Sequence, residues 1–244
     1  MRDRKIDLCG QVDFVRGADM PLLDRDARFT FACNGCGDCC RGREDIVLSG
    51  YDLYRIAGRL RLPPHIVARG FCRGSIGAVS HLPVLRLAPV KAEHNNCPFL
   101  SGSRCTIHDA EPLVCALYPL AQEITRAGEV RWFVQPTSCG GQITEARVED
   151  YLARYALQER EQTDVRWAQC CMALEDRVEA LESRLEPVLR KRMQARLWQA
   201  LYYDYDPMQP YLPQLERNLA ELEKALENLL KYQARRTTIE KIDE

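Results

Sequence analysis

The sequence predicts an α+β or mainly α protein in which a loop-rich, cysteine-rich domain over residues 1–144 precedes a long helical region over residues 145–244. Three observations support this division. Of the 12 cysteines, only Cys170 and Cys171 follow residue 140. No glycine occurs after residue 141, where the composition turns to Glu, Arg, Leu and Ala, most of which are good helix formers. Apolar residues in this second region recur at spacings of three and four, which is the period of an amphipathic helix.

The first region reads as short strands and loops, with one clear helix. Runs of β-forming residues predict strands within residues 28–32, 83–90 and 129–135. Ser49, followed three residues later by Asp52, has the pattern of a capping box and predicts a helix that begins at residue 50. Pro63 and Pro64 are expected to end it.

The second region is expected to form a helical hairpin with coiled-coil-like seams. Pro187 is expected either to kink the first seam or to begin a new helix, and a proline-rich connector over residues 202–213 precedes the last helix. Either the last helix packs inside the molecule, or it serves a protein partner or self-association. The first seam comprises Cys171, Leu174, Val178, Leu181, Leu185 and Val188, and the second comprises Leu212, Leu215, Leu219, Leu222, Leu226 and Leu229.

Charge and hydropathy limit the possible partners. The net charge is -1, so no general attraction to nucleic acid or to an anionic membrane is expected. The charged N-terminal segment lacks the apolar run of a signal peptide, and no run of about eighteen apolar residues follows. We therefore expect a cytoplasmic protein. In a reducing cytoplasm, dense cysteines indicate metal ligation or redox chemistry more than a disulfide framework.

The cysteines of "CNGCGDCC", residues 33–40, form the densest group. Cys33, Cys36 and Cys39 are separated by gaps of two residues, and the glycines between them permit tight turns that bring thiolates toward one centre. Cys40 is adjacent to Cys39, and because neighbouring side chains generally diverge, we expect it to face elsewhere and to serve a second site.

Further thiols come from "CPFLSGSRCTIHDAEPLVCALYP" and from "SCGG". Together with the first run they supply enough ligands for two four-coordinate sites, although spacing does not divide them between the sites. The candidate ligands are Cys33, Cys36, Cys39, Cys40, Cys97, Cys105, Cys115 and Cys139.

The ordered motifs "FACNGCGDCCRG", "CPFL", "CTIH", "EPLVCALYP" and "CGG" resemble the CxxCxxCC cysteine-cluster family, also called YkgJ-like. The resemblance spans about residues 31–141 and implies a zinc- or iron-chelating domain with these eight cysteines as ligands. A related cysteine cluster occurs in flagellin lysine-N-methylases. The family usually has arginines before the proline and after the cysteine of "EPLVC", where this chain has Glu111 and Ala116.

Three functions follow from these observations. Three cysteines in one tight run with widely spaced partners resemble cluster ligation more than paired zinc knuckles, so the main hypothesis is a redox or accessory protein that holds one or two iron-sulfur clusters, such as 4Fe-4S. A structural zinc module and an enzyme related to the flagellin methylases are the alternatives, and no catalytic residue is identified. His108 is interpreted as an imidazole that lies at the surface or contacts a ligand without binding the metal itself, and Cys9 and Cys72 as small buried residues.

Overall fold

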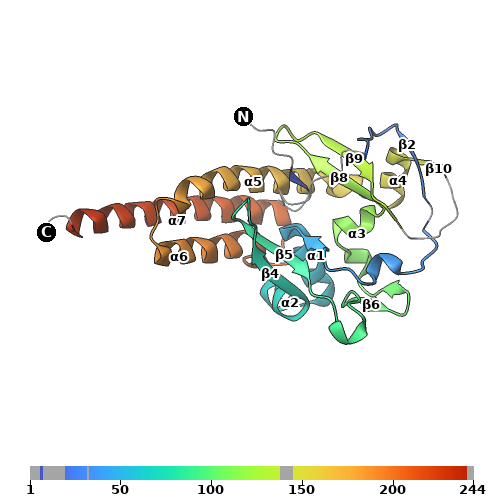
Figure 1. Ribbon diagram of the computed structural model, residues 1–244, viewed down its shortest axis with the longest axis horizontal. Helices are drawn as coiled ribbons and strands as arrows, with labels where there is room; N and C mark the ends of the chain where they lie inside the picture. Colours follow the sequence, from blue (N-terminus) through green and yellow to red (C-terminus); the bar gives the residue numbers. More distant parts are fainter. Residues whose placement is uncertain (1–5, 8–19, 32, 138–144, 241–244) are drawn as a thin grey trace.

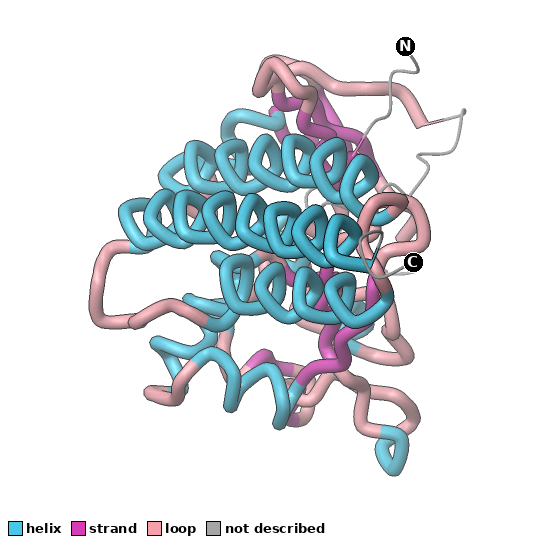
Figure 2. Tube along the Cα trace, turned by 90° about the vertical axis from the view of Figure 1, so that its left-hand side faces the viewer, coloured by secondary structure: helices cyan, strands magenta, loops and turns pink. Residues whose placement is uncertain are grey.

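The computed structural model describes residues 6–7, 20–31, 33–137 and 145–240. Figure 1 shows a body of short strands, short helices and loops, from which an arm formed by α5 (Gln158–Glu182), α6 (Pro187–Trp198) and α7 (Tyr211–Glu240) projects. Figure 2 shows the helices of the arm lying side by side. The predicted α+β class is confirmed. Within the described ranges, no helix has both the length and the apolar character needed to cross a bilayer.

The secondary structure combines long helices in the arm with short elements in the body. The helices are α1 (Gly50–Leu60), α2 (Pro64–Phe71), α3 (Leu113–Leu117), α4 (Val148–Arg154), α5 (Gln158–Glu182), α6 (Pro187–Trp198) and α7 (Tyr211–Glu240). Short 3-10 turns are η1 (Asp38–Cys40), η2 (Lys91–Glu93) and η3 (His108–Ala110), and a π-helical turn, η4 (Gln199–Tyr203), extends α6.

The strands form small antiparallel sheets. β8 (Leu120–Ile124) lies between β1 (Ile6–Asp7) and β9 (Val130–Val134), and β5 (Pro83–Leu87) lies between β3 (Val47–Leu48) and β4 (Cys72–Ile76). β2 (Arg28–Thr30) pairs with β10 (Glu145–Arg147), and β6 (Leu100–Ser101) pairs with β7 (Arg104–Cys105). Strands therefore form in each of the three runs that the sequence predicts, at β2, β5 and β9.

Two hydrophobic clusters hold these elements together, and each draws residues from both predicted regions. One includes Leu53 of α1 and Met193 of α6, and the other includes Phe29 of β2 and Tyr151 of α4. Gly50 marks a close approach between body and arm, since a side chain there would collide with the Leu201 carbonyl and the Trp167 ring. The division into residues 1–144 and 145–244 stays a prediction, but the body and the base of the arm share their cores.

The seams of the arm follow the predicted spacing except at its turn. Leu181 and Leu185 are buried, but Val188 is 61% exposed and Leu189 is buried in its place. The prediction for Val188 is wrong because Pro187 begins a new helix, α6, and so resets the phase of the apolar stripe. The second seam lies within α7, where Leu215, Leu222 and Leu226 are buried.

A buried ionic network joins the arm to the body. The predicted capping box is confirmed, because the Ser49 hydroxyl accepts from the Asp52 N–H while the Asp52 carboxylate accepts from the Ser49 N–H. The same carboxylate accepts from Arg160 of α5 at 2.8 Å and from the Leu113 N–H of α3 at 2.9 Å. Arg160 also binds Asp164 at 3.0 Å. These groups are 6% exposed or less.

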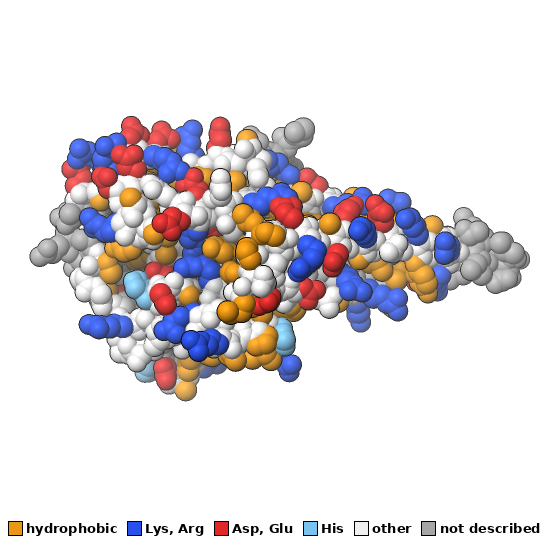
Figure 3. Space-filling model, turned by 180° about the vertical axis from the view of Figure 1, so that it is seen from behind, with side chains coloured by type: hydrophobic (Ala, Val, Ile, Leu, Met, Phe, Trp, Pro, Cys, Tyr) orange, Lys and Arg blue, Asp and Glu red, His pale blue; other side chains and the backbone are white. Residues whose placement is uncertain are grey.

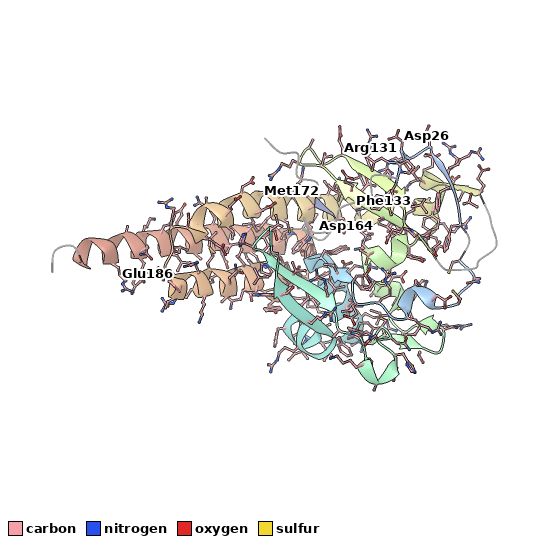
Figure 4. The ribbon with its side chains drawn as sticks, in the orientation of Figure 1. Asp26, Arg131, Phe133, Asp164, Met172 and Glu186 are labelled. Carbon is pink, nitrogen blue, oxygen red and sulfur yellow. The ribbon has the colours of Figure 1, made fainter. Side chains whose placement is uncertain are left out.

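The network contains more carboxylates than cations, because the guanidinium of Arg160 pairs with both Asp52 and Asp164. Burial would lower the pKa of Arg160, but Asp52 and Asp164 raise it above its ordinary value. Burial raises the pKa of Asp164 to about 7, with Asp52 adding to the effect and Arg160 opposing it. Asp164 lies on α5, near the body end of the arm (Figure 4). Asp52 accepts more hydrogen bonds, so Asp164 is the member that holds a proton most readily.

This assignment predicts how stability depends on pH. An unfolded Asp ionises near pH 4 while folded Asp164 ionises near pH 7, so its contribution to stability is present at low pH and is lost as the pH rises through this window, by up to about 1.4 kcal/mol per pH unit. Asp164→Asn should remove that slope. The measurement is the free energy of unfolding in urea from pH 5 to pH 8. Asp176→Asn, an exposed site on the same helix, should keep the slope, and equal slopes in all three proteins would contradict the assignment.

Candidate metal centre

Seven of the eight candidate cysteines line one cavity of about 330 Å³ in the body. They come from three separate parts of the chain, which the fold brings to a common space between η1, the β6–β7 hairpin and α3. The seven are Cys33, Cys36, Cys39, Cys40, Cys97, Cys105 and Cys115. The eighth, Cys139, lies outside the described residues, as does Cys9.

The first run curls around the cavity through its glycines. Gly35 and Gly37 have φ angles of 70° and 75°, which glycine adopts at little cost. The Gly35 N–H donates to the Cys33 sulfur at 3.4 Å. Arg41 fixes the end of the run because its guanidinium donates to the Cys36 carbonyl at 2.7 Å and to the Gly102 carbonyl at 3.0 Å. The loop that carries the run is thereby tied to the β6–β7 hairpin.

The other cysteines are placed by longer-range contacts. The Cys97 N–H donates to the Cys40 carbonyl at 2.8 Å, which joins the second segment to the first. Cys105 ends β7. Cys115 lies on α3, and the first N–H of that helix is the one bound by Asp52. The position of Cys115 therefore depends on the buried ionic network at the base of the arm.

The expectation that Cys40 faces away from the rest of its run is wrong. Cys39 and Cys40 line the same cavity, and their sulfurs are 4.0 Å apart. Both residues belong to η1. Neighbouring side chains leave a 3-10 turn about 120° apart, but the cavity is wide enough for both to line it. The seven candidate cysteines within the described residues therefore face one shared space.

The electrostatics of the cavity disfavour several thiolates at once. Burial raises the pKa of Cys115 well above its ordinary value, and Glu111 and the neighbouring cysteines raise it further. The pKa of Cys39 is also raised, chiefly by its hydrogen bond to Cys40 and by burial. Negative charges held this close repel one another in a medium of low dielectric constant, and a bound cation offsets that repulsion.

Sequence reasoning missed several wall residues. Glu111 is half-buried and pairs with His108 at 3.1 Å, and both side chains line the cavity. Burial raises the pKa of Glu111, while His108 opposes the shift. Tyr151 of α4 donates to the Tyr118 carbonyl at 2.6 Å and closes another part of the wall. The sequence had singled out His108, and Glu111 had a signal in its departure from the usual arginine. Tyr151 had none, because it lies outside the cysteine-rich region.

Cysteines outside the cavity have ordinary packing environments. Cys170 and Cys171 lie on α5 and are buried in the core, where they pack as apolar residues. Cys72 is half-buried at the start of β4, and burial raises its pKa to about 12. Thiols with raised pKa values in apolar surroundings are unreactive, so these residues are structural.

Comparison with known proteins agrees with the chemistry of the cavity. Residues 32–140 match the model of the CxxCxxCC family, which is described as "Putative zinc- or iron-chelating domain". Residues 32–140 carry a CxxCxxCC domain. Searches of curated proteins and of solved structures gave no significant match. The cavity cysteines fall inside the matched range, and the arm falls outside it.

The donor set of this CxxCxxCC domain fits zinc or iron, since thiolate sulfur is a soft ligand that binds zinc and iron-sulfur clusters. The thiols surround the cavity without meeting at one point: no group of three His, Cys, Asp or Glu side chains in the described part of the chain is close enough to hold a single ion. A sulfur separation of 4.0 Å between Cys39 and Cys40 is nevertheless near the roughly 3.8 Å expected between two sulfurs of a tetrahedral zinc site.

Two glycines of the first run provide a matched test of how the cavity is built. At Gly37 a Cβ atom would lie 3.0 Å from the Ser103 carbonyl, whereas at Gly35 it would meet nothing within 4 Å. Both alanine variants incur the cost of a positive φ, about 1 kcal/mol, but Gly37→Ala must also displace the β6–β7 hairpin. We expect Gly37→Ala to lower metal content and melting temperature more than Gly35→Ala does. Equal effects would show that contact between the run and the hairpin does not control the site.

Proposed function

We propose that the cysteine cavity of the CxxCxxCC domain holds an iron-sulfur cluster and that the protein serves as a redox or accessory protein. The observation that carries this proposal is the arrangement of seven thiols around one cavity of about 330 Å³. A single ion draws its ligands to one point, whereas a cluster of several iron and sulfide ions occupies the space between them. The resident group would supply one-electron chemistry, and the protein supplies the ligands and their surroundings.

The surroundings of the cavity support a cluster ligand set. Backbone N–H groups that donate to sulfur stabilise the negative charge of a cluster, and the Gly35 N–H already donates to Cys33. Arg43 lies within electrostatic reach of Cys115, which contributes to the raised pKa of Arg43 after its main partner, Asp45. Cys33, Cys36, Cys39, Cys40, Cys97, Cys105 and Cys115 are the candidate ligands in the described residues, and Cys139 stays a candidate from the sequence.

A structural zinc module is the second candidate. It is favoured by the 4.0 Å separation of the Cys39 and Cys40 sulfurs. In that case the ion stabilises the loop-rich body, because ligation free energy adds to folding free energy when the unfolded chain lacks the site. An enzyme related to flagellin lysine-N-methylases gains no specific support from the described residues.

Metal analysis of protein purified without oxygen distinguishes the two candidates. An iron-sulfur protein should contain iron and acid-labile sulfide, absorb broadly near about 400 nm and bleach on reduction with dithionite. Cys36→Ser should lower the iron and sulfide content and the melting temperature, because it removes a ligand from the cavity. Colourless protein with one or two equivalents of zinc and no sulfide would overturn the iron-sulfur proposal and support the zinc module.

The matched control is Cys72→Ser. Cys72 is half-buried but does not line the cavity, so this variant should keep its metal and change stability only through packing. Loss of metal in both variants would indicate general unfolding, and retention of metal in Cys36→Ser would exclude Cys36 as a ligand.

Glu111 offers an independent test through its charge. A carboxylate in the cavity wall disfavours the more negative, reduced state of a cluster, so Glu111→Gln should raise the midpoint potential by an amount on the order of tens of millivolts. The measurement is a dye-mediated redox titration at pH 8. Glu159→Gln, at an exposed site outside the cavity, is the control, and an unchanged potential in Glu111→Gln would mean that its charge does not act on the cluster.

A further inference from the structure

A groove on the helical arm has an apolar floor and a basic rim. It encloses about 640 Å³ between α6 and α7. Ala195, Ala225, Leu229 and Tyr232 supply apolar surface, and Tyr232 is 49% exposed. The rim is polar and comprises Arg192, Arg196, Gln199 and Asn228. The face of the molecule shown in Figure 3 carries hydrophobic side chains next to Lys and Arg side chains along the arm.

The residues that line the groove have the spacing expected of a surface that binds another helix. On α7 the lining positions 225, 229 and 232 are separated by four and three residues. Positions 192 and 196 of α6 and position 199, the first residue of the η4 turn that extends it, follow the same spacing. These are the residues that one face of each helix presents to a neighbour. Alanine at positions 195 and 225 leaves room for the backbone of a further helix at the usual axial distance of about 8–10 Å.

The charge of α6 determines which helix fits. This helix contains Arg190, Lys191, Arg192 and Arg196 and no acidic residue. Arg196 donates to the Gln199 amide oxygen, and neither Arg192 nor Arg196 has an acidic partner in the described part of the chain. Two arginines of the neighbouring helix differ, since Arg166 and Arg177 of α5 pair with Glu216 and Glu223 of α7. The basic rim is thus left without internal neutralisation.

We propose that the α6–α7 groove binds an acidic amphipathic helix of a partner protein. Leu or Ala side chains on one face of that helix would cover the floor, while Glu or Asp side chains at its edges would reach Arg192 and Arg196. A second copy of this chain fits less well, because a two-fold interface would bring the two basic rims together. This surface lies outside the CxxCxxCC domain, so the proposal does not depend on the metal that the cavity holds.

The proposal is tested with full-length, metal-loaded protein and a synthetic peptide. The probe is a fluorescent helix of roughly fourteen residues, about 21 Å long, with Leu and Ala on one face and Glu on the other. Fluorescence anisotropy at physiological ionic strength should show saturable binding, and a peptide with Lys in place of Glu should bind at least about tenfold more weakly. Absence of saturable binding, or equal binding of both peptides, would overturn the proposal.

Two charge reversals on the same helix make the result specific to the groove. Arg192→Glu should weaken binding of the acidic peptide about tenfold or more, whereas Lys191→Glu, which changes the charge equally but does not line the groove, should change it less than about twofold. Ala225→Trp should also weaken binding, because it fills the floor. Equal losses in the two charge variants would overturn the proposal, since general charge attraction would then explain the binding.

Sedimentation of the protein alone tests whether a second copy of this chain occupies the groove. A monomer over the tested concentrations supports the proposal. A concentration-dependent dimer that dissociates in Ala225→Trp would assign the groove to a second copy and would overturn it.

Discussion

The buried carboxylate of Asp52 is the constraint on which the rest of the structure depends. It caps α1, binds the first N–H of α3 and accepts from Arg160 of α5, so three elements from distant parts of the chain are fixed by one side chain. A buried charge is stable only when it is paired and hydrogen-bonded, and here nearly every acceptor position is used. Because α3 carries Cys115, this pairing also sets one wall of the cysteine cavity.

The cavity itself is built from elements too short to be stable alone. β6 and β7 have two residues each, η1 has three and α3 has five, and hydrogen bonds from Arg41 and Cys97 tie them to one another. Thiols whose pKa values rise through burial and mutual repulsion would add little stability to such a structure. Under the proposed function, the thiolates bind the positively charged metal centre, and this ligation replaces their mutual repulsion. The loops around the cavity are then stabilised by the metal that they bind.

The features that the sequence predicted are local, and those that it did not predict depend on distant contacts. The Ser49 capping box, the strands and the cysteine run each involve neighbouring residues, and their patterns were sufficient. Nothing in the spacing of α5 indicated that Arg160 would bind Asp52, which lies 108 residues earlier, or that Tyr151 would close the cavity. Cys40 was misjudged because divergence of adjacent side chains was taken to exclude a common cavity, and a cavity of about 330 Å³ is wide enough to be lined by both Cys39 and Cys40.

The two ends of the arm differ in the contacts that they make. At its base, α5 contributes Arg160 to the network that positions Cys115, so a substitution there would also change the geometry of the cavity. At its far end, where Glu186 lies (Figure 4), α6 and α7 are held together by contacts such as the hydrogen bonds between Glu186 and Gln233. The α6–α7 groove and the cysteine cavity have no lining residue in common, so the basic rim and the cavity are separate surfaces of the molecule. A helix bound in the groove would therefore not need to contact the cysteines of the cavity.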